Sequence, residues 1–309
     1  MPRRPRVLFA AALYAALSAV LGVPLAACGG GNGGSGSGSG SGSEPSVAAS
    51  ASFAPGTTMA RLAAAKKITV GTKYDQPGFG LQGLDGRPTG FDVEIAKIIA
   101  GKLGIPASGI TFVETPSAVR EEVLEQGKVD MVVATYTINA KRKQRISFAG
   151  PYYVAGQDLM VGKDDTKITG PESLKAAPTT KVCSVTGSTP AETVKKYLAS
   201  PSQLVLFDVY SKCADALRTG QVQVVTTDNV ILLGLVSKSN GAFKLVGKPF
   251  TKEPYGIGLK KGDTAFCGFI DDTLKEAASS GAYEKAWTST AGSVEGAQTP
   301  ILPSAAPCS

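Results

Sequence analysis

Histidine is absent from the 309 residues of this sequence. Without imidazoles the chain cannot form a Ser-His-Asp triad, a histidine metal site or a histidine general base, which disfavours most hydrolase chemistry. A GxxxxGK[ST] phosphate loop and a cysteine array with zinc spacing are also missing. We therefore expect no metal or cofactor, and these motifs single out no catalytic residue. Its 43% hydrophobic and 18% charged residues are those of a globular protein.

A strong excess of one charge sign is missing as well. The formal charge of +7 comes from 32 basic and 25 acidic residues, and Arg3, Arg4 and Arg6 lie in a leader that we expect to be removed. The remaining 29 basic and 25 acidic residues give a net charge of +4. Because the basic residues are scattered among acids and lack aromatic neighbours, we expect no nucleic-acid binding.

Residues 1–27 have the pattern of an export signal. A basic start precedes an apolar run over 7–21 that is too short for a membrane span. The signal ends in Leu-Ala-Ala-Cys at 25–28, which resembles the lipobox of bacterial lipoproteins. We expect Cys28 to carry a lipid that holds the protein at the outer face of the cell membrane. The alternative is a secreted protein cut after Ala27.

A tract of glycine and serine follows Cys28. Nine of the 37 glycines lie between residues 29 and 42, and small residues continue to about residue 57. Because such a segment has few side chains to bury, we expect a flexible tether over 28–60.

The other cysteines are Cys183, Cys213, Cys267 and Cys308. In an exported protein an even set predicts disulfides, with three possible connectivities. Cys183 lies on a predicted strand and Cys213 on a helix one βα unit later. Cys267 begins a predicted helix and Cys308 is one residue from the end. We favour the pairs Cys183–Cys213 and Cys267–Cys308 over buried free thiols.

Short β-rich runs alternate with helical patterns from Lys67 onward. The first group has strands at 68–71, 110–114 and 129–135, with helices at 91–103 and from Thr115-Pro116 to Gly127. This order predicts a βαβαβ unit with a parallel sheet. The pattern restarts with strands at 158–161, 181–185, 204–209 and 222–227 and helices at 189–198 and 212–219. A strand at 256–260 and helices at 264–280 and 282–289 follow.

The final segment is too short for a third domain, so we expect it to return to the first lobe. We predict an α/β protein with two lobes, each a mixed or parallel sheet flanked by helices. The first lobe comprises 61–156 and 251–309, and the second comprises 157–250. Two crossings, near 154–160 and 247–256, join them.

Polar residues follow the predicted strands where ligands bind open α/β sheets, beyond the carboxyl ends. Thr135 and Thr137 lead into a helix start, and Arg142 stands one turn further on. The helix start indicates an anion site, and the planar fork of Arg142 matches a carboxylate. Since other basic residues surround Arg142, a solvated basic helix is the open alternative.

The second lobe offers a matching set. Ser188 and Thr189 join a strand to a helix and could bind an anion or simply cap the helix. Asp228 ends an apolar and threonine-rich strand, where its carboxylate could hold an ammonium group or cap a helix beginning near Val230. A GxGxxG match at 78–83 is followed by a turn, not a helix, so we expect a loop there.

Several short motifs occur in the order found in family 3 of the periplasmic-type solute-binding proteins, the amino-acid receptors of ABC importers. The chain resembles that family over about residues 66–308. The motifs are Val-Gly-Thr at 70–72 and the segments 90–96, 127–131, 137–142 and 148–153. The segments 72–78 and 117–121 look like the glutamate-binding branch of Gram-positive importers. The resemblance implies the two-lobed periplasmic-binding-protein type II fold.

The resemblance also implies roles for individual residues. In this family the Arg at the position of Arg142 grips the ligand α-carboxylate, helped by groups at the positions of Thr135, Thr137 and the turn 188–189. The acid at the position of Asp228 receives the α-ammonium group. A second cation for a γ-carboxylate could come from Lys73 or from Arg120, although both could instead be surface charges.

The expected function is capture of an amino acid, with glutamate preferred, between the lobes of a monomer. Hinge closure would then present it to a permease with its ATPase. A glutamine or aspartate receptor is the nearest alternative. A lipoprotein that senses a ligand for a signalling partner would use the same pocket. A dehydratase-like enzyme using Glu114 with Asp228 is a third possibility, which the glutamate-type motifs disfavour.

Overall fold

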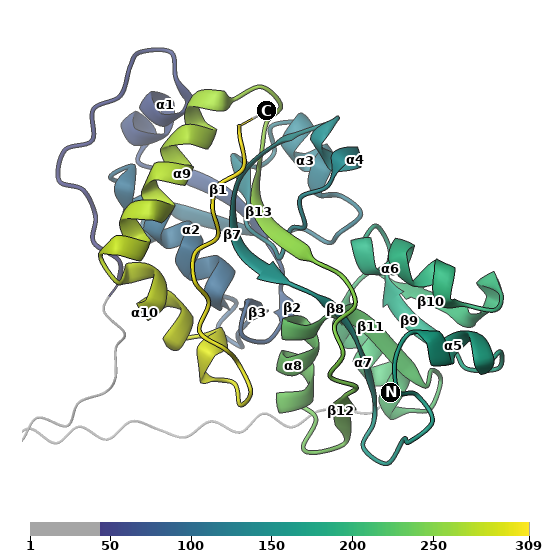
Figure 1. The fold of residues 1–309 in the computed structure, drawn as a ribbon. Helices are drawn as coiled ribbons and strands as arrows, with labels where there is room; N and C mark the ends of the chain where they lie inside the picture. Colours follow the sequence, from purple (N-terminus) through teal and green to yellow (C-terminus); the bar gives the residue numbers. More distant parts are fainter. Residues whose placement is uncertain (1–43, 309) are drawn as a thin grey trace, which may run out of the picture. The chain divides into compact units, whose positions relative to one another are not determined.

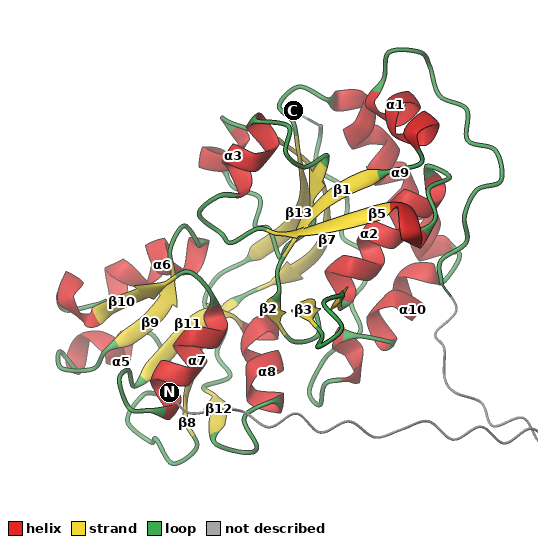
Figure 2. Cartoon of the chain, turned by 180° about the vertical axis from the view of Figure 1, so that it is seen from behind, coloured by secondary structure: helices red, strands yellow, loops and turns green. Residues whose placement is uncertain are grey.

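The computed structural model describes residues 44–308. The expected signal 1–27, the lipidation site Cys28 and the Gly/Ser tract to residue 43 lie outside the described residues. Figures 1 and 2 show the described chain from opposite sides, with two β-sheets that each have helices packed against them. Between residues 44 and 308, no helix combines the length and the apolar character that a bilayer crossing requires.

The first sheet has five strands in the order β5-β1-β6-β13-β7. β1, β5 and β6 run parallel, whereas β13 runs antiparallel to β6 and β7. The strands are β1 (Ile68–Thr72), β5 (Ile110–Glu114), β6 (Met131–Val132), β7 (Ser147–Ala155) and β13 (Glu253–Leu259). The helices of this first lobe are α1 (Thr58–Ala65), α2 (Phe91–Lys102), α3 (Arg120–Glu125), α4 (Ala140–Lys143), α9 (Thr264–Ser279) and α10 (Ala282–Thr288).

The second sheet has five strands in the order β10-β9-β11-β8-β12. β9, β10 and β11 are parallel, and β8 runs antiparallel to β11 and β12. The strands are β8 (Gln157–Gly162), β9 (Val182–Val185), β10 (Leu204–Phe207), β11 (Val224–Asp228) and β12 (Phe243–Leu245). The helices of this second lobe are α5 (Glu172–Ala176), α6 (Thr189–Val194), α7 (Tyr210–Arg218) and α8 (Asn229–Ser237).

The chain passes between the two sheets twice. The first passage runs from β7 through Gly156 into β8, and the second joins β12 to β13 over 246–252. Buried apolar side chains form separate cores on the two sides, with Phe91 and Trp287 in the first lobe and Val185 and Leu232 in the second. Two mixed sheets flanked by helices are the α/β architecture that the alternation of elements predicts.

Two local expectations were wrong, and one strand was missed. The helix after Pro116 begins at Arg120, because the Thr115 hydroxyl donates to the carbonyl of Thr72 at 3.1 Å instead of capping a helix. The loop expected around 78–83 lies in a small antiparallel sheet of β2 (Asp75–Gln76), β3 (Gly80–Gln82) and β4 (Pro88–Thr89). Strands of two or three residues are too short to show an alternating pattern. β7 was not expected as a strand at all.

The expected tether ends too late. The backbone N–H of Ala48 donates to Gly101 O at 2.9 Å, and Phe53 packs edge-on against Phe269. Helix α1 begins at Thr58, and its N-cap Thr57 accepts a hydrogen bond from Ala60 N–H. Residues 44–60 therefore pack on the first lobe. Their small side chains gave no sign of these contacts in the sequence.

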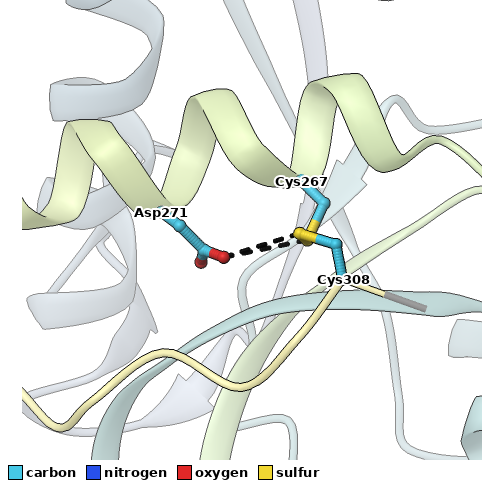
Figure 3. A group of neighbouring side chains, drawn as sticks. All are labelled: Cys267, Asp271 and Cys308. Carbon is cyan, nitrogen blue, oxygen red and sulfur yellow. Dashed lines mark hydrogen bonds between the residues drawn. A yellow bond between two sulfur atoms is a disulfide. The ribbon is translucent and has the colours of Figure 1, made fainter.

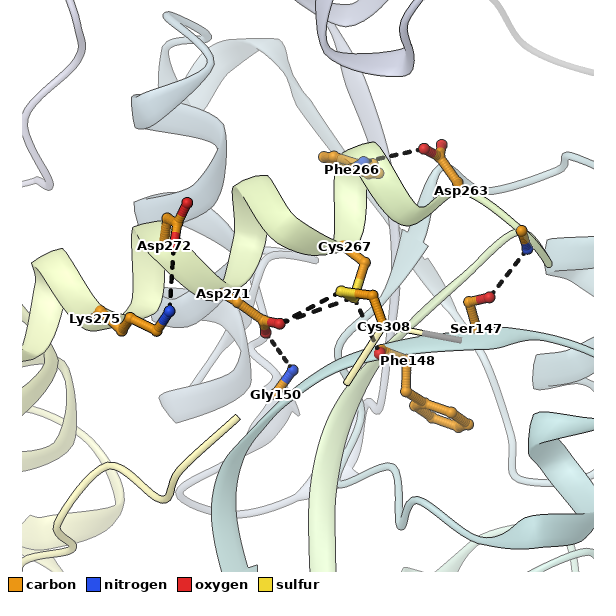
Figure 4. Close-up of a disulfide and its surroundings, with 11 residues drawn as sticks. Ser147, Phe148, Gly150, Asp263, Phe266, Cys267, Asp271, Asp272, Lys275 and Cys308 are labelled. Carbon is orange, nitrogen blue, oxygen red and sulfur yellow. Dashed lines mark hydrogen bonds and ion pairs between the residues drawn. A yellow bond between two sulfur atoms is a disulfide. The ribbon is translucent and has the colours of Figure 1, made fainter. Parts of the chain in front are cut away.

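Each lobe contains one disulfide, Cys183–Cys213 and Cys267–Cys308, and these are the pairs favoured from the order of the elements. Figure 3 shows Cys308, from the C-terminal segment, bonded to Cys267 on α9 beside Asp271. Asp271 Oδ1 accepts a hydrogen bond from the N–H of Gly150 in β7 at 2.6 Å (Figure 4). Because the two sulfurs are bonded to each other, neither is a thiolate available to a metal. The disulfide thus fastens the chain end to the first lobe.

Candidate ligand-binding site

A small cavity lies between the carboxyl ends of strands from both lobes. The first lobe contributes Gln76, Ser117, Arg120, Thr135 and Thr137, and the second contributes Ser188, Thr189, Pro190, Tyr210, Thr227, Asp228 and Ile231. Six of the eight predicted ligand residues are in this set. Arg142 and Lys73 are not, although both lie next to it.

Arg142 connects the lobes. Its Nη2 donates to Gly187 O at 3.0 Å, and its Nη1 donates to Thr137 O at 2.7 Å and lies 3.3 Å from Thr189 Oγ1. Its Nε donates to Glu121 at 3.1 Å. The side chain is buried, so the solvated basic helix is the wrong alternative for this residue.

Asp228 occupies the N-cap position of α8, but its side chain makes no capping hydrogen bond. Instead Oδ2 accepts a hydrogen bond from the Tyr255 hydroxyl at 2.7 Å. Oδ1 is buried and has no hydrogen-bond partner among the described residues. Burial, reinforced by the charge of Glu253, raises the pKa of Asp228. This buried carboxylate lines the cavity and forms no ion pair with the described residues.

The hydroxyl of Ser188 does cap a helix. It accepts a hydrogen bond from the N–H of Ala191 at 3.1 Å at the start of α6. Gly187, just before it, packs so closely on Ala118 of the first lobe that an added Cβ would lie 2.8 Å from the Ala118 Cα. The turn 187–189 is therefore a point of direct contact between the lobes.

Lys73 is buried beside the cavity, with 1% of its surface exposed. Its Nζ lies 3.8 Å from Asp75 Oδ1 and 5.9 Å from the centre of the Tyr210 ring, and it makes no hydrogen bond with the described residues. Desolvation lowers the pKa of Lys73 to about 8, against the raising effect of Asp75. The surface-charge alternative is wrong for Lys73.

Arg120 is also buried, and its guanidinium lies 4.2 Å from the centre of the Tyr136 ring. Its Nη1 donates to Ala134 O at 2.7 Å, while Nε has no hydrogen-bond partner within the described part of the chain. Burial, and then the charge of Arg142, lowers the pKa of Arg120 to about 10. It is the cation that lines the cavity directly.

Sequence reasoning missed Gln76 and Tyr210, which both line the cavity. Gln76 lies in the glutamate-type motif 72–78, so that motif could have indicated it as a ligand-binding residue. Tyr210 gave none, because it precedes the predicted start of its helix by two residues. Glu114, considered as an acid for catalysis with Asp228, is exposed on β5 and does not line the cavity.

Known proteins resemble this chain over most of its described length. The family described as bacterial extracellular solute-binding proteins, family 3, matches residues 68–289. The glutamate-binding protein GluB of Corynebacterium efficiens is 40% identical over 234 residues, which are 73% of this chain and 79% of the relative. The ABC transporter glutamine-binding protein GlnH of Bacillus subtilis is 38% identical, over 74% of this chain and 82% of the relative.

Solved structures agree with this likeness. An ancestral arginine-binding protein bound to glutamine superposes with a TM-score of 0.67 at 35% identity, covering 73% of this chain and 97% of that one. The predicted two-lobed fold is thereby confirmed. Match, fold and cavity lead to one conclusion: the chain belongs to family 3 of the bacterial extracellular solute-binding proteins, which are extracytoplasmic receptors rather than enzymes.

Proposed function

We propose that this protein binds an α-amino acid, L-glutamate, in the cavity between its lobes and delivers it to the permease of an ABC importer. One observation carries the proposal. Arg120 Nε and Asp228 Oδ1 are buried, opposite in charge and without hydrogen-bond partners among the described residues, and both side chains line one small cavity. A ligand that carries an ammonium group and a side-chain carboxylate satisfies both charges at once, which removes the cost of burying them alone.

The α-ammonium group is assigned to Asp228. This carboxylate is already held by Tyr255 and keeps its second oxygen for the ligand. The α-carboxylate is assigned to the turn 188–189 with Arg142. A carboxylate that replaces the Thr189 hydroxyl as the acceptor for Arg142 Nη1 gains a charged donor and stays within reach of Thr137.

The γ-carboxylate is assigned to Arg120, with Lys73 behind it. Arg120 lines the cavity, and the ammonium of Lys73 lies near the ring of Tyr210, which also lines it. Two buried cations match the second acidic group of glutamate, whereas glutamine would leave their charge unbalanced. The similarity to a glutamate-binding protein supports this choice over glutamine or aspartate.

Delivery of the ligand to the permease would depend on closure of the two lobes and on attachment of the receptor to the membrane. We assign 61–156 and 251–309 to one lobe and 157–250 to the other, with the ligand closing one onto the other in a monomer. A lipid on Cys28 would keep the receptor at the outer face of the membrane, beside the permease and its ATPase. In cells fed with labelled palmitate, the protein should carry the label, and Cys28→Ser should lose it and leave the membrane fraction. Membrane retention of unlabelled Cys28→Ser would refute this anchor.

Thermal unfolding tests the ligand. The chain without its first 43 residues, freed of bound ligand, is titrated with each common amino acid. Glutamate should raise the melting temperature most, with smaller shifts from aspartate and glutamine, because a ligand that binds only the folded state stabilises it by mass action. A larger shift with glutamine would reassign the ligand, and no shift with any amino acid would overturn the proposal.

A further inference from the structure

The carboxylate of Asp92 is buried in the first turn of α2, outside the set of residues that line the cavity. Its Oδ2 accepts a hydrogen bond from the backbone N–H of Thr135 at 2.8 Å. Its Oδ1 accepts one from the Tyr152 hydroxyl at 2.5 Å. Both oxygens therefore have donors, and one of those donors belongs to a residue that lines the cavity.

The peptide group between Ala134 and Thr135 is held at both of its ends. Its N–H donates to Asp92, and its carbonyl, on Ala134, accepts a hydrogen bond from Arg120 Nη1 at 2.7 Å. Within residues 44–308, Arg120 forms no ion pair with a carboxylate. A buried negative charge and a buried positive charge are thus joined through a single peptide dipole, which each of them strengthens.

This peptide has an orientation that the backbone alone does not favour. Thr135 has a φ of +44°, in the left-handed region that side chains other than glycine rarely adopt. A half-turn of the peptide would return the φ of Thr135 to a negative value, but it would turn the N–H away from Asp92 and the carbonyl away from Arg120. The two hydrogen bonds therefore hold the less favoured orientation.

The Thr135 side chain depends on the same peptide. Its hydroxyl lies 3.0 Å from Gln76 Oε1 and 2.8 Å from Ala134 O, and both Thr135 and Gln76 line the cavity. Turning the peptide would move the hydroxyl and withdraw the acceptor that fixes Arg120.

We propose that Asp92 is a positioning residue for ligand recognition: through the Ala134–Thr135 peptide it orients the guanidinium of Arg120 and the hydroxyl of Thr135 into the cavity. The identity of the ligand rests on the proposed function, whereas the geometry of the peptide does not. Burial raises the pKa of Asp92 to about 7, and its two donors and the charge of Arg120 oppose that rise.

The first test needs no ligand. In ¹⁵N-labelled, ligand-free protein, the Thr135 amide proton should resonate downfield and exchange slowly, as expected for an amide bound to a buried carboxylate. Asp92→Asn should shift it upfield and accelerate its exchange about tenfold. The matched control Tyr152→Phe removes the other donor to Asp92 and should leave the Thr135 amide unchanged. An Asp92→Asn protein with an unaltered Thr135 amide would overturn the proposal.

The second test measures binding by calorimetry. Asp92→Asn should weaken glutamate about tenfold, more than it weakens glutamine, and Tyr152→Phe should stay within about twofold of the unaltered protein. In an Arg120→Met background, Asp92→Asn should cost less glutamine affinity than it does in the unaltered protein, since only the Thr135 hydroxyl is then left to be displaced. A lower melting temperature of Asp92→Asn with unaltered affinity would show a role confined to stability and refute positioning, and so would an equal loss of affinity in either background. If the unaltered protein binds no glutamate, the proposed function fails while the Thr135 amide still decides the role of Asp92.

Discussion

The backbone N–H of Tyr210, the first residue of α7 in the second lobe, donates to Asp75 Oδ2 of β2 in the first lobe at 2.5 Å. Because this contact joins the lobes, Asp75→Asn should favour the open cleft. We expect an affinity for glutamate about tenfold lower, since a hydrogen bond to a charged acceptor is replaced by a neutral one. Small-angle scattering of the ligand-free variant should show a larger radius of gyration. Unchanged affinity and radius would exclude this contact from closure.

Replacing the two buried arginines, Arg142 and Arg120, should affect ligand affinity in different ways. Arg142→Ala should abolish detectable binding of every amino acid, because the α-carboxylate is common to all of them. Arg120→Met should weaken glutamate about a hundredfold but glutamine far less, since removing one partner of a buried charge pair leaves the other uncompensated. Calorimetric titrations with both ligands measure the split.

Folding of the arginine variants is the control for those titrations. Circular dichroism and thermal unfolding should show that Arg142→Ala remains folded, because its contacts lie at the cleft and not in either core. Glutamate affinity unchanged in folded Arg142→Ala would refute its assignment to the α-carboxylate. Equal losses for glutamate and glutamine in Arg120→Met would remove Arg120 from side-chain selectivity.

Lys73 should make glutamate binding depend on pH. Its pKa is lowered from 10.5 to about 8 by burial, so the ligand-free protein loses this positive charge as the pH rises through about 8. Affinity for glutamate should therefore fall above that pH, and binding near pH 8 should take up protons, because the ligand carboxylate favours the charged lysine. Calorimetry in buffers of different ionisation enthalpy measures the uptake. Lys73→Met should bind glutamate more weakly and lose this proton uptake. If the variant kept the full uptake, a group other than Lys73 would be taking up the protons.

Lys73 should also make the stability of the fold depend on pH, in the opposite direction: a rising pH weakens glutamate binding but stabilises the folded protein. Between pH 8 and 10.5 the unfolded chain binds a proton at Lys73 that the folded chain does not. The free energy of unfolding should therefore rise with pH across that window, relative to Lys73→Met. Urea denaturation of both proteins along a pH series gives this difference. A difference that is flat or falls with pH would show that Lys73 is not desolvated in the folded protein.

Most of the cavity was predictable because strand ends in an α/β sheet meet at one edge. Thr135, Thr137 and Asp228 were found by reading which polar residues follow a buried strand, and each lines the cavity. Competing local interpretations were harder to decide. Ser188 caps α6, whereas Asp228 at the corresponding position of α8 does not. The carboxylate of Asp228 instead accepts a hydrogen bond from the hydroxyl of Tyr255, on a strand distant in the sequence.

The rest depended on contacts that a sequence pattern does not contain. Asp92 looks like an ordinary acidic residue in a first helical turn, and only the fold places it against Thr135, 43 residues away. Tyr210 and Asp75 are separated by 135 residues. The sheet of β2, β3 and β4 offered too few residues for a periodic signal.

The two disulfides should differ in their effect on binding. Cys183–Cys213 fixes α7, whose first residue Tyr210 lines the cavity and contacts the other lobe, while Cys267–Cys308 fastens the C-terminal segment to the first lobe. The two disulfides close loops of 30 and 41 residues, so each should contribute about 4 kcal/mol to the free energy of unfolding. Replacing both cysteines of either pair by serine should therefore lower the urea midpoint similarly. Only the Cys183/Cys213 double variant should also weaken glutamate, by several-fold, since α7 can then move away from Asp75. Equal affinities for the two folded variants would show that α7 is held in place without its disulfide.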